Sequence, residues 1–181
     1  FKGNEGEWLR LGEVISSYPN ISIDFERLAV LDFISEITNM LVDTEDCNEI
    51  YDFLEKTLTS LNKGFSPLTC ALIYFAKVLK ATGYGLDLSH CAICGSKEGI
   101  NHLSLKDGGV ICNNCANNSE TSEIEEKNLK ILKYIFNVNL ENFEKIAFSN
   151  NECKNSIFGL AEFFNFTSQI EIKSLTLLRE I

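Results

Sequence analysis

Four of the seven cysteines form two closely spaced pairs, and they are the residues of this sequence best suited to a defined chemistry. The pairs are Cys91-Ala-Ile-Cys94 and Cys112-Asn-Asn-Cys115, and 17 residues separate Cys94 from Cys112. A two-residue spacer lets both sulfurs of a pair turn toward one ion, and two such pairs supply the four thiolates of a tetrahedral zinc site. Because cysteine fills every position, no ligand site is left for water. The spacing therefore favours one structural zinc ion over a catalytic one.

Two other interpretations of the same spacing stay open, namely two pairs of reduced thiols or a redox-active pair. The cysteine count is odd and no secretory signal is visible, so we expect a reducing, cytoplasmic compartment. His90 and His102 are interpreted as loop side chains, because the cysteines already complete a metal shell. A zinc deaminase is excluded, since its catalytic glutamate is missing and Asn114, not proline, precedes Cys115.

The remaining candidate residues are better explained by packing or solvation. Cys47, Cys70 and Cys153 are predicted to be small buried side chains. The acidic residues between positions 43 and 49 are interpreted as a solvated helix junction, with a metal site as the alternative. Trp8 is expected to pack against another part of the protein, and the alternative is stacking on a base. No nucleophile has a recognisable acid–base partner, so no catalytic site is predicted.

The elements that must position the cysteine pairs are a hairpin and a set of helices. Residues 104–111 alternate around Gly108-Gly109, which predicts a hairpin that carries the second pair back to the first. Helical periodicity elsewhere predicts a mainly α helical bundle. The predicted helix starts combine a capping residue with an apolar face, and they are Asp24, Asp46 with Glu49, Ser66-Pro67, and Ser122 with Glu125. Two further helices are predicted around residues 157–164 and 172–181.

Charge and hydropathy exclude several classes of protein. The chain has 16 Lys and Arg against 26 Asp and Glu, a net charge of −10, and residues 1–90 hold 7 of the bases and 14 of the acids. Nucleic-acid binders normally present a basic face, so this balance argues against DNA binding by these residues alone. No apolar run approaches the roughly 18 residues of a membrane span. Residues 7–15 alternate like a half-buried strand that needs a partner, and we expect the chain to be a fragment.

Several motifs together resemble the RecO family of bacterial DNA-repair proteins. The resemblance covers nearly the whole chain. It is carried by the run Leu79 to Tyr84, Leu86-Asp87-Leu88, the two cysteine pairs, Asp107-Gly108-Gly109-Val110-Ile111, and the closing Ile172-Lys173-Ser174-Leu175 with Leu178.

The resemblance implies a recombination mediator that is not an enzyme. In this family an N-terminal OB fold binds DNA, a helical domain carries a zinc ribbon, and the protein acts with RecR, SSB and RecA and anneals strands. It implies a remnant OB strand and linker over residues 1–20, and a helical domain over residues 21–181 with the ribbon at about 88–118. Two departures are the absence of most of the OB fold and the negative charge.

We therefore expect this portion to be a helical and zinc-ribbon scaffold for RecR and SSB, with weak DNA binding of its own. Its expected location is the bacterial cytoplasm, with nucleoid association during repair. A zinc-ribbon nucleic-acid or transcription module is one alternative, and a thiol redox or zinc switch is another. The first would need basic and aromatic residues on the ribbon, where Lys97 and Lys106 are the only bases.

Overall fold

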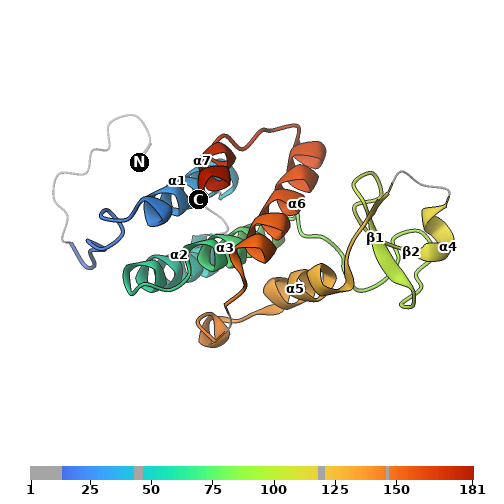
Figure 1. Cartoon of the computed structure of the whole chain (residues 1–181), viewed down its shortest axis with the longest axis horizontal. Helices are drawn as coiled ribbons and strands as arrows, with labels where there is room; N and C mark the ends of the chain where they lie inside the picture. Colours follow the sequence, from blue (N-terminus) through green and yellow to red (C-terminus); the bar gives the residue numbers. More distant parts are fainter. Residues whose placement is uncertain (1–13, 43–46, 118–120, 146) are drawn as a thin grey trace.

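The computed structural model describes residues 14–42, 47–117, 121–145 and 147–181. Figure 1 shows two regions along the long axis of the molecule: a body of packed helices and, at one end, a small group of strands. We call the first the helical body, and the second, residues 89–117 and 121–124, the ribbon. This arrangement confirms the predicted mainly α fold with an inserted cysteine ribbon.

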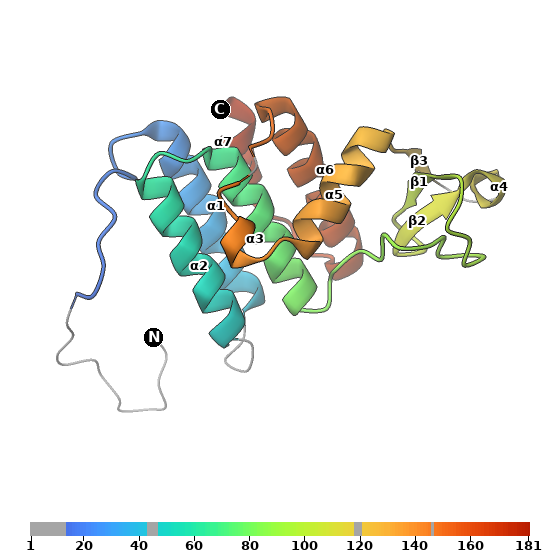
Figure 2. The ribbon, with the colours of Figure 1, turned by 90° about the horizontal axis from the view of Figure 1, so that it is seen from below.

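Helix α3 (Pro67–Ala81) forms the centre of the helical body, and 11 of its 15 residues are buried. A helix that is apolar around most of its circumference needs neighbours on nearly every side. Figure 2 shows these neighbours around it. The helices of the body that surround or support α3 are α1 (Phe25–Leu41), α2 (Cys47–Asn62), α5 (Glu126–Asn137), α6 (Asn150–Ser168) and α7 (Leu175–Glu180).

Capping side chains begin two of these helices where the sequence predicts. The Asp24 carboxylate accepts a hydrogen bond of 3.2 Å from the Arg27 N–H at the start of α1. Ser66 likewise accepts from the Thr69 N–H at the start of α3. These bonds satisfy backbone donors that have no partner inside the helix. The predicted cap of α2, Asp46, lies outside the described residues.

The ribbon is a three-stranded sheet of order β2-β1-β3, built from β1 (Ile100–Ser104), β2 (Gly109–Cys112) and β3 (Ser122–Glu123). Strands β1 and β2 pair antiparallel as the predicted hairpin, with Leu103 opposite Val110. In the turn between them, the Ser104 hydroxyl donates to Asp107 at 2.7 Å and Gly108 has a φ of 72°. Glycine adopts this left-handed backbone without steric cost, so the turn explains the first of the two glycines.

Two helix starts differ from the sequence-based expectation. Ser122 and Glu125 have the spacing of a capping box, but Ser122 lies in β3 and α5 begins without a side-chain cap. Pairing of Ser122 with Leu103 in β1 holds this residue in the sheet, so it is not free to cap. Conversely, Ser149 and Glu152 form a complete capping box for α6 in the asparagine-rich region where no start was predicted.

The closing motif fastens the end of the chain to α1. Ile172 is buried, and the N–H groups of Lys173 and Ser174 donate to the two oxygens of the Glu36 carboxylate at 3.0 and 2.7 Å. The last helix, α7, begins at Leu175, three residues later than the apolar pattern predicts. The turn at Lys173 and Ser174 that leads into α7 is therefore bound by a side chain of a distant helix.

The predicted strand over residues 7–15, including Trp8, falls almost wholly outside the described residues. Val14 and Ile15 are described, and both are exposed and outside any strand. Within the described part of the chain, no helix combines the length and the apolar character that crossing a membrane requires.

Candidate metal centre

The first cysteine pair lies on a tight turn that is anchored to the body and to β2. Leu86 and Leu88 are buried in the core of the helical body just before the turn. Inside the turn, the Cys91 N–H donates to the Ser96 carbonyl at 2.7 Å, and the Gly95 N–H donates to the Cys91 carbonyl at 2.9 Å. Gly95, which follows the pair, has a φ of 74°, and this left-handed backbone conformation favours glycine at that position.

The second pair spans the end of β2 and the short helix α4 (Asn113–Ala116). Cys112 closes the strand, and Cys115 follows one turn later in α4. The Asn113 N–H donates to the Gly99 carbonyl at 2.9 Å, which ties α4 to the loop that leaves the first pair. Backbone hydrogen bonds in both arms therefore bring the two pairs to the same place.

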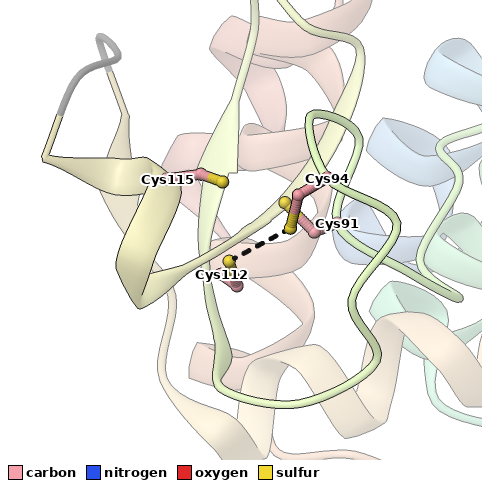
Figure 3. Close-up of side chains that lie close together, drawn as sticks. All are labelled: Cys91, Cys94, Cys112 and Cys115. Atoms are coloured by element: carbon pink, nitrogen blue, oxygen red, sulfur yellow. Dashed lines mark hydrogen bonds between the residues drawn. The ribbon is translucent and has the colours of Figure 1, made fainter.

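Figure 3 shows the four side chains turned toward a common centre, and their sulfur atoms all lie within 4.8 Å of one another. The Cys94 and Cys112 Sγ atoms are 3.7 Å apart. A disulfide would require about 2.05 Å, whereas four sulfurs at about 2.3 Å from a central ion are separated by about 3.8 Å. The donor set thus fits a tetrahedral ion that prefers sulfur, such as zinc.

The electrostatics of the cluster also suit a cation. Burial opposes ionisation of Cys91, but N–H groups of Cys112, Cys94 and Ile93 point at its sulfur and lower its pKa to about 6. Hydrogen bonding to Cys94, together with burial, raises the pKa of Cys115 to about 12. Without a compensating positive charge, the Cys115 thiol therefore stays protonated at neutral pH. A divalent ion supplies that charge, so metal binding releases protons.

The two histidines are engaged by other neighbours. His90 Nδ1 lies 2.6 Å from the Ser89 hydroxyl and 3.3 Å from the Asp87 carboxylate. His102 Nδ1 lies 2.7 Å from the Asn101 side-chain oxygen. Neither histidine belongs to the cluster, in which the only ligand atoms are the four sulfurs.

The other predicted candidates are placed apart from this centre. Cys70 and Cys153 are buried, and burial raises the pKa of both thiols. The Cys153 sulfur contacts the Thr69 hydroxyl at 3.5 Å, as expected for a small core side chain. The side chain of Cys47 and the acidic residues 43–46 lie outside the description, and the exposed Glu49 belongs to no metal-ligand group of the described residues.

One residue that the sequence analysis treated only as part of a turn has a more specific role. The backbone of Gly109 forms a bridge with Asp87, and the Val110 N–H donates to the Asp87 carbonyl at 3.4 Å. A Cβ on Gly109 would lie 3.0 Å from that carbonyl oxygen. Gly109 is therefore the point at which the ribbon packs closely against Asp87, in the segment that leads from the body to the first cysteine pair. The Gly-Gly doublet was the signal in the sequence for this contact. The turn between β1 and β2 requires glycine only at position 108, so the second glycine indicates a separate constraint.

The fold and the site together define a class of protein, a helical domain with an inserted four-cysteine ribbon. A family model described as "Recombination protein O C terminal" matches residues 23–176. The chain therefore belongs to the RecO family, as its motifs indicated.

Several curated proteins are similar to most of this chain. DNA repair protein RecO of Thermoanaerobacter sp. (strain X514) is 27% identical over 152 residues, which cover 82% of this chain and 61% of that protein. DNA repair protein RecO of Oceanobacillus iheyensis is 26% identical over 175 residues, covering 96% of this chain and 68% of that protein. The RecO protein of Bacillus subtilis (strain 168) is 31% identical over 108 residues, covering 59% and 42%. The chain thus spans about three fifths of the length of such relatives.

Proposed function

We propose that this chain is the partner-docking portion of a recombination mediator that is not an enzyme. In this proposal the helical body and the ribbon hold the proteins RecR and SSB, and an OB fold binds and anneals DNA. Residues 1–20 would link the two portions, as the family resemblance implies. The observation that carries the proposal is the family match across residues 23–176, which include both the helical body and the ribbon.

We further propose that one zinc ion per chain holds the ribbon together through Cys91, Cys94, Cys112 and Cys115. Sulfur separations that suit a tetrahedral shell support this assignment. The ion would supply structural cross-linking and no reaction step, because a shell of four thiolates leaves no position for water or substrate.

Several basic side chains are engaged within the chain, which supports the proposal that this portion binds DNA only weakly. Four of them pair with carboxylates, in the pairs Arg27–Asp24, Lys56–Glu144, Lys127–Glu152 and Lys130–Glu126. Lys77 and Lys80 both donate to the Phe136 carbonyl at the end of α5. Positive charge that is already engaged within the chain contributes little to phosphate binding, which depends on releasing counterions from the nucleic acid.

Two binding measurements on one preparation test the proposal, with zinc content determined on the same sample. A pull-down against purified RecR and SSB, each alone, should retain at least one of them. A titration with a single-stranded oligonucleotide at physiological salt should give a Kd weaker than about 100 µM, the weak end of nonspecific binding. The scaffold proposal fails if neither protein is retained. Tight DNA binding with a steep salt dependence would instead favour a nucleic-acid-binding ribbon.

A further inference from the structure

Helices α1 and α2 both pack against α3, and a groove of about 590 Å³ lies between them. Helices α1 and α2 lie in the part of the body away from the ribbon, as Figures 1 and 2 both show. The walls of the groove are mainly apolar side chains, and its lining consists of Leu31, Ile34, Ser35, Thr38, Asn39, Val42, Leu54 and Leu58.

The two walls follow helical spacing and remain partly open to solvent. Leu31 on α1 and Val42, the residue that follows this helix, are half-buried. On α2, Leu54 and Leu58 are half-buried one turn apart. Tyr51 continues the α2 wall one turn earlier and is 60% exposed. Leu31, Val42, Leu54 and Leu58 pack against the core of the body and keep part of their surface exposed. They form an apolar surface of the kind that an amphipathic helix covers.

The floor of the groove contains a pair of hydroxyl groups that are hydrogen-bonded to each other. The Thr38 hydroxyl lies 2.7 Å from the Tyr74 hydroxyl of α3 and donates to the Ile34 carbonyl at 2.6 Å. Tyr74 itself is fully buried. These hydroxyl groups already have hydrogen-bond partners within the chain. An apolar side chain of a ligand can therefore cover them without leaving a donor unpaired.

The groove has the length of a short helix. Leu31 and Val42 are eleven positions apart, and at 1.5 Å per residue this distance is about 16 Å, or about three helical turns. A partner helix of about 11 residues would therefore fill it from end to end.

The helices that form the groove are strongly acidic on their outer surfaces. Helix α2 carries Glu49, Asp52 and Glu55, whereas Asp32 and Glu36 of α1 line a neighbouring hollow toward α7 and Lys173. The two bases of these helices, Arg27 and Lys56, are already paired with Asp24 and Glu144. Among the described residues, Asp32, Asp52 and Glu55 have no ion-pair partner. The α2 side of the groove, where Glu55 lies next to Leu54 and Leu58, thus presents negative charge to a ligand.

We propose that the groove between α1 and α2 binds an amphipathic helix of a partner protein, with an apolar stripe flanked by Lys or Arg. The apolar walls would bind the apolar stripe of the partner helix, and the acidic residues of α2 would pair with its Lys or Arg side chains, as in other helix-in-groove complexes. This proposal specifies a surface for the scaffold role and rests on it. The other possible occupants are residues 1–13 of this chain, a second copy of it, or an acidic peptide.

Two designed 14-residue helical peptides test the groove directly. One places leucines on one face and lysines on the other, and the second replaces every lysine with glutamate. By fluorescence anisotropy, the Leu/Lys peptide should bind the 181-residue chain at least tenfold tighter than the Leu/Glu peptide. Its binding should weaken at least tenfold in the double variant Leu54→Gln and Leu58→Gln. Ile170→Gln is the matched control, because Ile170 is exposed at 43% between α6 and α7 and should leave the affinity unchanged.

The other occupants give distinct results that overturn the proposal. Equal or tighter binding of the Leu/Glu peptide would favour an acidic partner, and a tenfold gain in affinity after deletion of residues 1–13 would show that this segment occupies the groove. A dimer in solution that the double variant dissociates would indicate a second copy. The double variant must keep the circular dichroism and melting behaviour of the parent. If the chain retains RecR or SSB but does not bind the Leu/Lys peptide, the proposal that the groove binds a helix fails and the scaffold proposal stands.

Discussion

The helical body and the ribbon are held together by different forces. In the body, α3 is surrounded by other helices, and one large apolar core includes Phe33, Tyr74 and Phe75. In the ribbon, the separate buried cluster consists only of Cys91, Ile111 and Cys112, with two partly buried neighbours. The body can fold by burying apolar surface. Of the ribbon's other apolar side chains, Val110 is buried in the core of the body and Leu103 packs against that core, so little apolar surface is buried within the ribbon itself. From this comparison we expect the stability of the ribbon to depend on its cysteine site.

The expected magnitudes agree with this division. A structural zinc site contributes roughly 10–16 kcal/mol of apparent binding free energy, which is comparable with the roughly 5–15 kcal/mol stability of a whole domain. Removal of the metal should therefore unfold the ribbon and leave the body folded. The following experiments test that separation, from the largest expected effect to the smallest.

Cys112→Ser should have the largest effect, because it removes one of four ligands from a site on which the ribbon depends. We expect hydrogen exchange of the β1 and β2 amides to accelerate at least about a hundredfold, a loss of about 3 kcal/mol or more from the metal's contribution. Exchange in α3 should remain slow. Cys153→Ser is the matched control, since its sulfur lies in the body beside Thr69 and outside the cluster. Equal loss of ribbon protection in both variants would contradict the account.

Phe33→Ala should produce the reverse pattern. The Phe33 side chain is fully buried and makes an edge-to-face contact with Phe75 at a centroid distance of 5.2 Å. Its removal should lower the free energy of unfolding by about 3–5 kcal/mol, measured by chemical denaturation followed at 222 nm. Below the transition, the zinc content should stay unchanged. Loss of metal from the folded variant would show that the two regions are not independent.

Gly109→Ala should affect the junction between the two regions. The new Cβ would meet the Asp87 carbonyl at 3.0 Å, so the ribbon must shift, at a cost of about 1–3 kcal/mol. Competition with a colorimetric chelator should show about tenfold weaker metal retention. Gly159→Ala is the control, because nothing lies within 4 Å of a Cβ at that position in α6. Unchanged metal retention in Gly109→Ala would mean that the close contact has no energetic role.

Glu36→Gln should have the smallest effect, confined to the body and dependent on pH. Burial opposes ionisation of Glu36, but hydrogen bonds from Ser174 and Lys173 outweigh it and lower its pKa below the ordinary 4.5. A lowered carboxyl pKa stabilises the fold above about pH 4.5, and this contribution disappears as the pH falls through the folded-state pKa. We expect the variant to lose about 0.5–1 kcal/mol at pH 7, after screening by solvent, and much less at pH 3.

Asp32→Asn is the matched control for Glu36→Gln, because Asp32 lies one turn earlier in α1 and makes no hydrogen bond to the closing segment. Denaturant unfolding curves at both pH values provide the measurement. A loss of stability in Glu36→Gln that is the same at pH 3 and pH 7 would show that the charge of Glu36 does not hold the end of the chain.

Much of the division into a helical body and a cysteine ribbon was predictable from the sequence, because the motifs that mark these two regions are local. The spacing of the cysteines, the caps at Asp24 and Ser66, and the glycine doublet each act over a few residues. The start of α5 was mispredicted because pairing of Ser122 with a strand about 20 positions earlier prevented its predicted role as a cap. The binding of residues 173 and 174 by Glu36, 137 and 138 positions away, leaves no local pattern and could not be predicted.

The groove between α1 and α2 was also beyond sequence reasoning. Periodicity marks Leu54 and Leu58 as apolar-face residues, which predicts burial. They stay half-buried because α1 and α2 each pack on α3 and leave a space between themselves. Only the tertiary arrangement shows where an amphipathic face lacks a partner.

Zinc content per chain tests the central claim most directly, since the ribbon is proposed to depend on the metal and the body is not. Inductively coupled plasma mass spectrometry of protein purified without chelators should find about one zinc per chain, and Cys112→Ser should reduce this to near zero while far-ultraviolet circular dichroism stays helical. A folded wild-type ribbon that holds no metal, or that holds either cysteine pair as a disulfide, would contradict the account.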